Sequence, residues 1–142
     1  MDSGDLHVVD RATNEVKFTQ EKAHEYQMWF TMLDSSDDNI VYTAADDTRF
    51  KGWDVRAPGA PIFSCQHDYG VCCIKPWAYS DQTLLTGGYD SALKFWDKRK
   101  VMRDPAATGK DLLFTKLIGK SVWDVKFSEE SKSNRRVMGL SC

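Results

Sequence analysis

The sequence predicts an all-β chain built from repeated, four-stranded antiparallel units, and two observations support this prediction. A Trp-Asp pair occurs at Trp53-Asp54 and again at Trp96-Asp97, 43 residues later. Short runs of β-branched and apolar residues alternate with turn residues, and no segment has a sustained helical period. A period of roughly 40–45 residues is the length of one blade of a β-propeller.

The repeat extends well beyond the Trp-Asp pair. Between positions 24 and 56, a shift of 43 residues brings nine residues onto identical ones without a gap. The aligned pairs are His24 with His67, Tyr26 with Tyr69, Asp38 with Asp81, Thr43 with Thr86, Asp47 with Asp90, Lys51 with Lys94, Trp53 with Trp96, Asp54 with Asp97 and Arg56 with Arg99. This alignment predicts two consecutive blades that share the same architecture.

Each repeat is predicted to be a hairpin followed by an outer strand. The hairpin strands end in apolar or Trp-Asp residues, and Asp- or Gly-containing turns join them. In the first repeat the predicted strands are 40–44, 49–54 and 62–65. In the second they are 83–87, 92–97 and 112–117, with a Pro- and Gly-containing linker at 105–109.

The flanking segments are partial copies of the same unit. Residues 6–10 match the end of a blade in which Val9 replaces the Trp, and residues 122–127 match the start of one. Residues 136–142 are then expected to form its second strand, after a polar loop at 128–136. We therefore expect one domain over residues 1–142, made of a blade tail at 1–11, blades at 24–65 and 67–117, and a partial blade at 119–142.

Composition excludes several classes of function. The formal net charge is −2 and the pI is about 5.9, whereas nucleic-acid binding needs a clustered basic face. The longest apolar runs are far shorter than the roughly 20 residues of a membrane span. The four cysteines form no Cys-x-x-Cys pair, so we expect reduced thiols and no metal site. We expect the protein to be located in the cytoplasm and also in the nucleus.

Two sets of four residues resemble the His–Ser/Thr–Asp–Trp set of WD-repeat proteins. These sets are His24, Thr43, Asp47 and Trp53 in the first repeat, and His67, Thr86, Asp90 and Trp96 in the second. The resemblance implies a buried hydrogen-bonded chain that ties the inner strands of each blade to the loop entering it. The residue types suit that role, because an indole N–H only donates whereas a hydroxyl and an imidazole both donate and accept.

The segments between these motifs resemble a narrower family, the WD-repeat diphthine methyl ester hydrolases of diphthamide biosynthesis. The resemblance covers residues 40–142 and is most distinctive in Gly70-Val71-Cys72 and in Val122-Trp123 with Val125-Lys126. It implies a methylesterase that frees the carboxylate of methylated diphthine on the translation elongation factor, its implied partner, without a cofactor. No catalytic residue carries over from the resemblance, and no Gly-x-Ser-x-Gly motif is present.

A non-enzymatic scaffold that binds other proteins is the alternative, because the propeller fold by itself specifies no function. The resemblance also implies a closed ring of about seven blades, within the usual range for propellers. We therefore expect this chain to be an open arc of about three blades that is inactive alone. Its uncovered strand edges predict self-association or poor solubility, and residues 1–5 and 128–142 are expected to be the least ordered.

Other candidate site residues have a structural interpretation beside the functional one. His67 and Cys72 could form a base and nucleophile, but we expect His67 in the Trp96 network and the cysteines in the core. Asp47 and Asp90 could act in acid–base chemistry, but their matched turn positions indicate a structural role. The three tryptophans outside the Trp-Asp pairs could face the propeller channel, although packing is the expected role. They are Trp29, Trp77 and Trp123.

Overall fold

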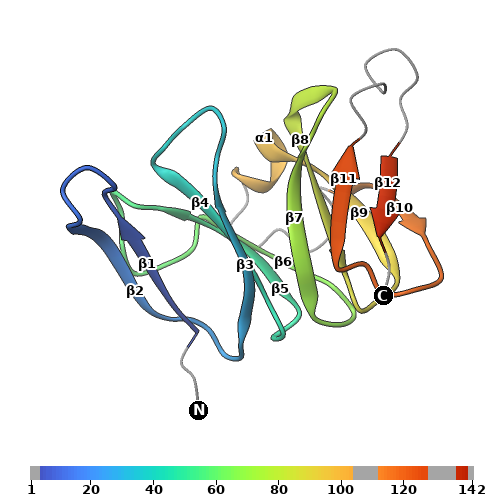
Figure 1. Ribbon diagram of the computed structural model, residues 1–142, viewed down its shortest axis with the longest axis horizontal. Helices are drawn as coiled ribbons and strands as arrows, with labels where there is room; N and C mark the ends of the chain where they lie inside the picture. Colours follow the sequence, from blue (N-terminus) through green and yellow to red (C-terminus); the bar gives the residue numbers. More distant parts are fainter. Residues whose placement is uncertain (1–3, 104–111, 128–136, 141–142) are drawn as a thin grey trace.

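The computed structural model describes residues 4–103, 112–127 and 137–140, the last of these as backbone only. Two four-stranded antiparallel sheets form its centre (Figure 1). The first blade consists of β3 (Met28–Leu33), β4 (Ile40–Ala45), β5 (Arg49–Asp54) and β6 (Phe63–Gln66). The second blade consists of β7 (Val71–Trp77), β8 (Ser80–Gly88), β9 (Ala92–Asp97) and β10 (Leu112–Leu117). Each sheet is a meander in which neighbours in sequence are neighbours in space.

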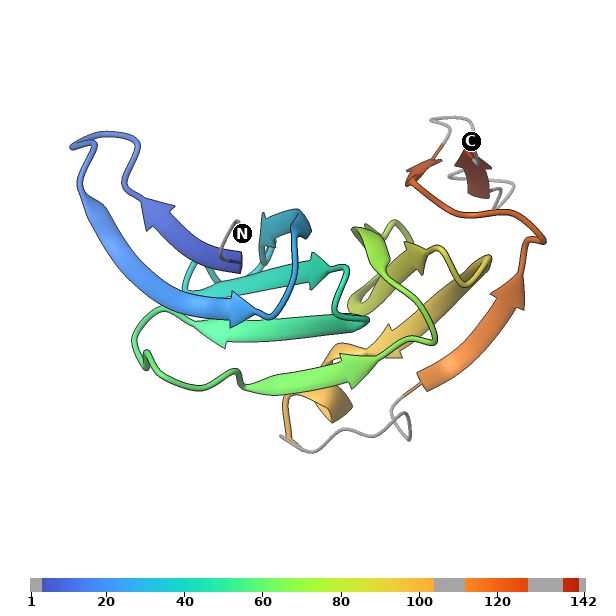
Figure 2. The ribbon, with the colours of Figure 1, turned by 90° about the horizontal axis from the view of Figure 1, so that it is seen from below.

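Two-stranded hairpins stand beyond these blades. β1 (Gly4–Val9) pairs with β2 (Val16–His24), and β11 (Asp124–Phe127) pairs with β12 (Val137–Leu140). Figure 2 shows the two hairpins at opposite ends of the row of sheets, which does not close on itself. The all-β class and the open arrangement of four-stranded sheets predicted from the sequence are therefore confirmed.

The structure contains two elements that the sequence did not predict. β2 extends the N-terminal hairpin to His24, beyond the predicted blade tail at 1–11, and only three of its nine residues are buried. Such a polar edge strand lacks the apolar alternation that marks a strand in a sequence. The four-residue helix α1 (Lys98–Val101) follows β9, and the Asp97 side chain accepts a hydrogen bond from the Arg99 backbone N–H at its start. One turn is too short to show a helical period.

The hydrophobic core lies between the sheets rather than within one of them. The largest cluster joins the first blade, through Tyr42, Phe50 and Phe63, to the second blade, through Ile74 and Trp96. A smaller cluster lies between the first blade and the β1–β2 hairpin, and another between the second blade and β11. Each sheet is thus stabilised by its neighbours, as expected for stacked blades.

Some sequence predictions concern residues that the structure does not describe. The linker at 105–109 and the loop at 128–136 lie outside the described residues, as do positions 1–3 and 141–142. The blade boundaries and the predicted self-association remain predictions. Among the described residues, no helix has the length and apolar character needed to cross a membrane.

Candidate functional site

The four predicted network residues of the first blade lie together at one end of the sheet. Thr43 Oγ1 is 2.9 Å from Trp53 Nε1 and 2.7 Å from His24 Nε2. His24 Nδ1 is 2.8 Å from the nearer carboxylate oxygen of Asp47. Because the indole N–H only donates, Thr43 accepts from Trp53 and donates to His24, which leaves the imidazole proton on Nδ1 for Asp47.

The second blade repeats this arrangement. Thr86 Oγ1 lies 2.8 Å from both Trp96 Nε1 and His67 Nε2, and His67 Nδ1 is 2.9 Å from Asp90. Burial lowers the pKa of His67 and outweighs the opposing hydrogen bond to Asp90, so this imidazole is neutral near neutral pH. For Asp90, burial favours the neutral acid, but the bonds to His67 and Lys94 outweigh it and the pKa is lowered.

Each aspartate of the network also shapes the turn before the third strand of its blade. Asp47 accepts a hydrogen bond from the Arg49 backbone N–H, and the residue between them, Thr48, has a φ of 65°. In the second blade Asp90 accepts from the Ala92 backbone N–H, and Ser91 has a φ of 59°. A short polar side chain that bonds to the backbone two residues later is typical of a tight turn. The structure therefore gives both carboxylates a turn-forming role.

A lysine joins each network, and the sequence analysis did not assign it. Lys94 Nζ is 3.2 Å from Asp90, and Lys51 Nζ donates to the backbone oxygen of Ala23 at 2.7 Å while lying 3.8 Å from Asp47. The alignment of Lys51 with Lys94 in the repeat was the signal that could have identified them.

Both ring nitrogens of His24 and of His67 are hydrogen-bonded within the networks, so these imidazoles are unavailable as general bases.

The suggested pair of His67 and Cys72 does not form. His67 is bonded to Asp90 and Thr86, whereas the Cys72 side chain shares a hydrogen bond with Tyr89. Burial raises the pKa of Cys72, and the bond from Tyr89 does not offset it. Cys73 points into the core between the second blade and β11, and burial raises its pKa to about 12. A thiol with a raised pKa is a poor nucleophile, so neither cysteine is set up for covalent catalysis.

Three aromatic side chains, two of them exposed, gather instead around the innermost strands. Trp29 on β3 and Trp123, which precedes β11, have ring centroids 6.1 Å apart at an interplanar angle of 81°. Tyr89, in the β8–β9 turn, lies 5.1 Å from Trp123 at 87°. Trp29 and Trp123 keep 38% and 39% of their surface exposed. We call Trp29, Tyr89 and Trp123 the inner aromatic cluster.

A charged pair lies on the same inner strands. Lys75 Nζ on β7 is 3.0 Å from Asp124 Oδ1 on β11 and 5.3 Å from the centroid of the Phe30 ring on β3. Burial opposes ionisation of Asp124, but the hydrogen bond and charge of Lys75 outweigh it and lower the pKa of that carboxyl. Lys75 thus connects three successive inner strands.

The third tryptophan outside the Trp-Asp pairs has a packing role, as expected. Trp77, at the end of β7, makes edge contacts with Tyr79, Phe95 and Phe127 at 5.3, 5.1 and 5.7 Å between centroids. It is separate from the inner aromatic cluster, which contains Trp29 and Trp123.

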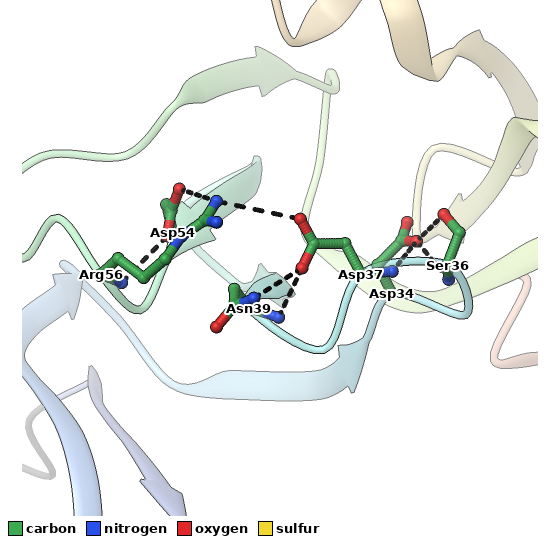
Figure 3. A network of polar contacts seen from close by, with 6 residues as sticks. All are labelled: Asp34, Ser36, Asp37, Asn39, Asp54 and Arg56. Atoms are coloured by element: carbon green, nitrogen blue, oxygen red, sulfur yellow. Dashed lines mark hydrogen bonds and ion pairs between the residues drawn. The ribbon is translucent and has the colours of Figure 1, made fainter.

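A second polar network lies around the β3–β4 loop. Asp34 Oδ1 accepts from the backbone and hydroxyl of Ser36, and Asp37 accepts from Asn39 (Figure 3). Arg56 Nη2 is 2.7 Å from Asp54 Oδ2 and 3.8 Å from Asp37 Oδ2, and Figure 3 shows the guanidinium between the two carboxylates. These contacts organise the surface loops of the first blade.

Asp34 also connects the two blades. Lys98 Nζ in α1 is 2.5 Å from Asp34 Oδ2, and the Tyr42 hydroxyl donates to the same oxygen at 2.7 Å. Burial favours the neutral acid, but the bonds from Lys98, Ser36 and Tyr42 hold the pKa of Asp34 well below its usual range. The repeat offered no signal for this pair, because Trp77 and Val55 stand at the equivalent positions.

The described side chains were also compared with what a metal site requires. Within residues 4–103 and 112–127, no cluster of three or more His, Cys, Asp or Glu side chains could hold a metal ion.

Comparison with known proteins identifies both the repeat and a set of relatives. Residues 59–97 match the family model of the WD domain, G-beta repeat. The chain is 34% identical to the diphthine methyltransferases of Mus musculus and Homo sapiens, over 73% and 74% of its length. It is 26% identical, over 99% of its length, to the diphthine methyltransferase of Schizosaccharomyces pombe.

The matched regions cover only part of these relatives. The chain spans 22% and 24% of the mouse and human proteins and 41% of the fission yeast protein. Together with the sheet arrangement, these matches define the kind of protein. The chain is a WD-repeat chain, an open run of β-propeller blades similar in sequence to the diphthine methyltransferases.

Proposed function

We propose that this protein acts in diphthamide biosynthesis and hydrolyses the methyl ester of diphthine on the translation elongation factor. The observation that carries the proposal is the 34% identity to the mouse and human diphthine methyltransferases over 73% and 74% of the chain. Their names specify diphthine and methyl transfer. Hydrolysis of the methyl ester, in place of the methyl transfer in those names, is the finer part of the proposal.

Hydrolysis requires only water as the second reactant. The water oxygen attacks the ester carbonyl carbon, the bond from that carbon to the methoxy oxygen breaks, and the methoxy group leaves as methanol after taking up a proton. The products are the free carboxylate, methanol and one proton released to solvent. In this proposal the Lys75 ammonium, which is 3.0 Å from Asp124 on the inner strands, stabilises the negative oxygen that forms during attack.

Methanol release tests the reaction directly. The complete polypeptide that the gene encodes should be incubated with elongation factor carrying diphthine with an isotope-labelled ester methyl group. We expect labelled methanol, and elongation factor lighter by one ester methyl group in a mass spectrum. Label that stays on the elongation factor would refute hydrolysis. Uptake of methyl label from a methyl donor would instead identify a methyltransferase.

A matched pair of variants tests the role of Lys75. Lys75→Met should slow methanol release by about 100-fold, the usual order for one lost electrostatic donor. Lys17→Met is the control, because the exposed Lys17 side chain pairs with the surface residues Asp10 and Glu15. Equal rates for both variants and the parent protein would remove Lys75 from the mechanism. Tight binding of the elongation factor without methanol release would favour the scaffold function.

We further propose that the protein works in the cytoplasm, where its substrate, the elongation factor, would be synthesised and would act in translation. Fluorescence imaging of the tagged protein tests this. Exclusion of the tagged protein from the cytoplasm would refute it.

A further inference from the structure

We propose that a pocket beside the first blade binds an α-amino acid through its ammonium and carboxylate groups. The pocket has a volume of about 440 Å³, within the usual range for small-molecule sites. We call it the outer pocket, because β5 and β6 on its wall are the third and fourth strands of their sheet. Its polar lining residues are Glu25, Asp47, Thr48, Arg49, Lys51 and Ser64. None of them belongs to the Lys75–Asp124 pair that the proposed hydrolysis uses, so the two proposals can fail independently.

Two opposite charges in the outer pocket have no partner among the described residues. Arg49 lines the pocket from β5 and is half-buried, whereas Glu25 lines it from the segment after β2 and is exposed. Their backbone N–H groups donate to Asp47, but within residues 4–103 and 112–127 neither side chain forms an ion pair or a hydrogen bond. A ligand with a carboxylate and an ammonium group can pair with both side chains across the pocket.

The other two charges of the pocket already compensate each other. The Asp47 carboxylate is hydrogen-bonded to His24 and lies 3.8 Å from Lys51 Nζ. Lys51 Nζ also donates to the backbone oxygen of Ala23 at 2.7 Å, and an ammonium group has three N–H donors. The two carboxylates and two cations of the lining sum to zero, so an anion or a cation alone would leave an unbalanced charge. The ligand that keeps this balance carries one charge of each sign.

The repeat shows that Arg49 is not needed to build a blade. Lys51 recurs as Lys94 in the second network, but Ala92 stands at the position equivalent to Arg49. A half-buried guanidinium has lost part of its hydration, and this loss is not offset unless a partner binds. The planar guanidinium can donate two hydrogen bonds to one carboxylate. We therefore expect Arg49 to bind the carboxylate of the ligand and Glu25 to accept hydrogen bonds from its primary ammonium group.

The remaining lining residues indicate which side chain the amino acid carries. Thr48 and Ser64 both have hydroxyl groups, and Pro61 adds an apolar ring. A hydroxyl group both donates and accepts, so it suits an amide or a hydroxyl group of a ligand. We therefore expect an amino acid with a short, polar and uncharged side chain.

L-Asparagine and two analogues that each lack one charge test this ligand class. N-acetyl-L-asparagine has no ammonium group, and L-asparaginamide has no carboxylate. The purified protein should be titrated with each compound while the backbone amide signals of Thr48, Arg49 and Ser64 are followed by NMR. We expect L-asparagine to bind about tenfold more tightly than either analogue, because each analogue loses a charge-assisted contact, and to shift these signals. Equal affinity for the three compounds, or binding of none, would overturn the proposal.

Two variants assign the two charges of the ligand. Arg49→Gln should remove the preference for L-asparagine over L-asparaginamide and keep the preference over N-acetyl-L-asparagine. Glu25→Gln should have the opposite effect, whereas a purely structural role of either residue would weaken binding of all three compounds alike. Arg56→Gln is the matched control, because this exposed arginine pairs with Asp54 outside the pocket.

The exposed position of Glu25 keeps the test decisive if Arg49→Gln unfolds by circular dichroism. Binding of the three compounds that is unchanged or equally weakened in Glu25→Gln would refute the site. A loss in Arg56→Gln equal to that in the pocket variants would refute it as well.

Discussion

The two blades carry nearly the same hydrogen-bond network in different packing environments. The bond from the indole to the threonine measures 2.9 Å in the first blade and 2.8 Å in the second, and the bond from threonine to histidine 2.7 and 2.8 Å. Trp53 packs with Leu6 and Phe18 of the two-stranded β1–β2 hairpin, whereas Trp96 packs with the aromatic residues of a complete blade. Local sequence therefore reproduces the polar geometry, while the apolar stabilisation of each copy depends on its neighbour.

One contact breaks the equivalence of the blades. The buried pair of Asp34 and Lys98 joins the first blade to the second, and their side chains are 2% and 7% exposed. No matching pair exists one repeat earlier, because Val55 occupies the position of Lys98. The comparison thus separates features set within a blade from those set between blades, and the two kinds should respond differently to substitution.

The largest effect is expected when this inter-blade pair is broken. Lys98→Met should lower the free energy of unfolding by about 3–5 kcal/mol, because the Asp34 carboxylate stays buried without its cation. Arg56→Met, which removes an exposed ion pair with Asp54, should change it little. A urea titration followed by tryptophan fluorescence measures both. Similar values for the two variants would show that the pair between blades contributes no more than a surface pair.

The next largest effect is expected at the centre of each network. Thr43→Val and Thr86→Val should each cost about 2–4 kcal/mol, since both the indole N–H and the imidazole Nε2 lose their partner in a buried place. The comparison of the blades predicts similar losses, because the hydrogen-bond lengths are alike. Denaturant titration of both variants tests this. A clear difference between them would mean that the surroundings, and not the network, decide the cost.

Replacing the indole by a phenyl ring, which removes the N–H donor together with part of the ring, should have a smaller effect. Trp53→Phe and Trp96→Phe should each cost about 1–3 kcal/mol, with the larger loss at Trp96 because it has more buried neighbours. Trp77→Phe is the matched control, since that ring makes edge contacts with Phe95 and Phe127. Thermal unfolding by circular dichroism gives the ranking. Parent-like stability of both network variants would contradict the contribution of these bonds.

The smallest predicted effect is that His67 makes the free energy of unfolding depend on pH. Burial lowers its pKa from 6.5, so below about pH 6.5 the unfolded chain binds a proton that the folded chain does not. The contribution of His67 to the free energy of unfolding should therefore be fully present above that pH. It should decrease as the pH falls toward the lowered pKa. Urea titrations at about pH 7 and about pH 5 measure the slope. His67→Gln should flatten it, and an unchanged slope would assign the effect to other groups.

Much of the fold could be predicted from the sequence, because it depends on patterns that are local and repeated. The shift of 43 residues aligned the hairpins, their Asp-containing turns and both sets of network residues, and an all-β open arrangement followed. Hydrogen bonds between residues of the same repeat recur wherever the repeat recurs, so His67, Thr86 and Trp96 could be identified from their counterparts.

Only the tertiary structure decided which residues from different blades meet. β2 carries too few apolar residues to mark a strand, and Asp34 and Lys98 have no counterparts one repeat away. The approach of Trp29 to Trp123 depends on how successive inner strands stack, which no spacing in the sequence encodes. Local periodicity therefore determined each blade, while the packing of one sheet on the next placed the exposed aromatic and charged groups that give the molecule its candidate sites.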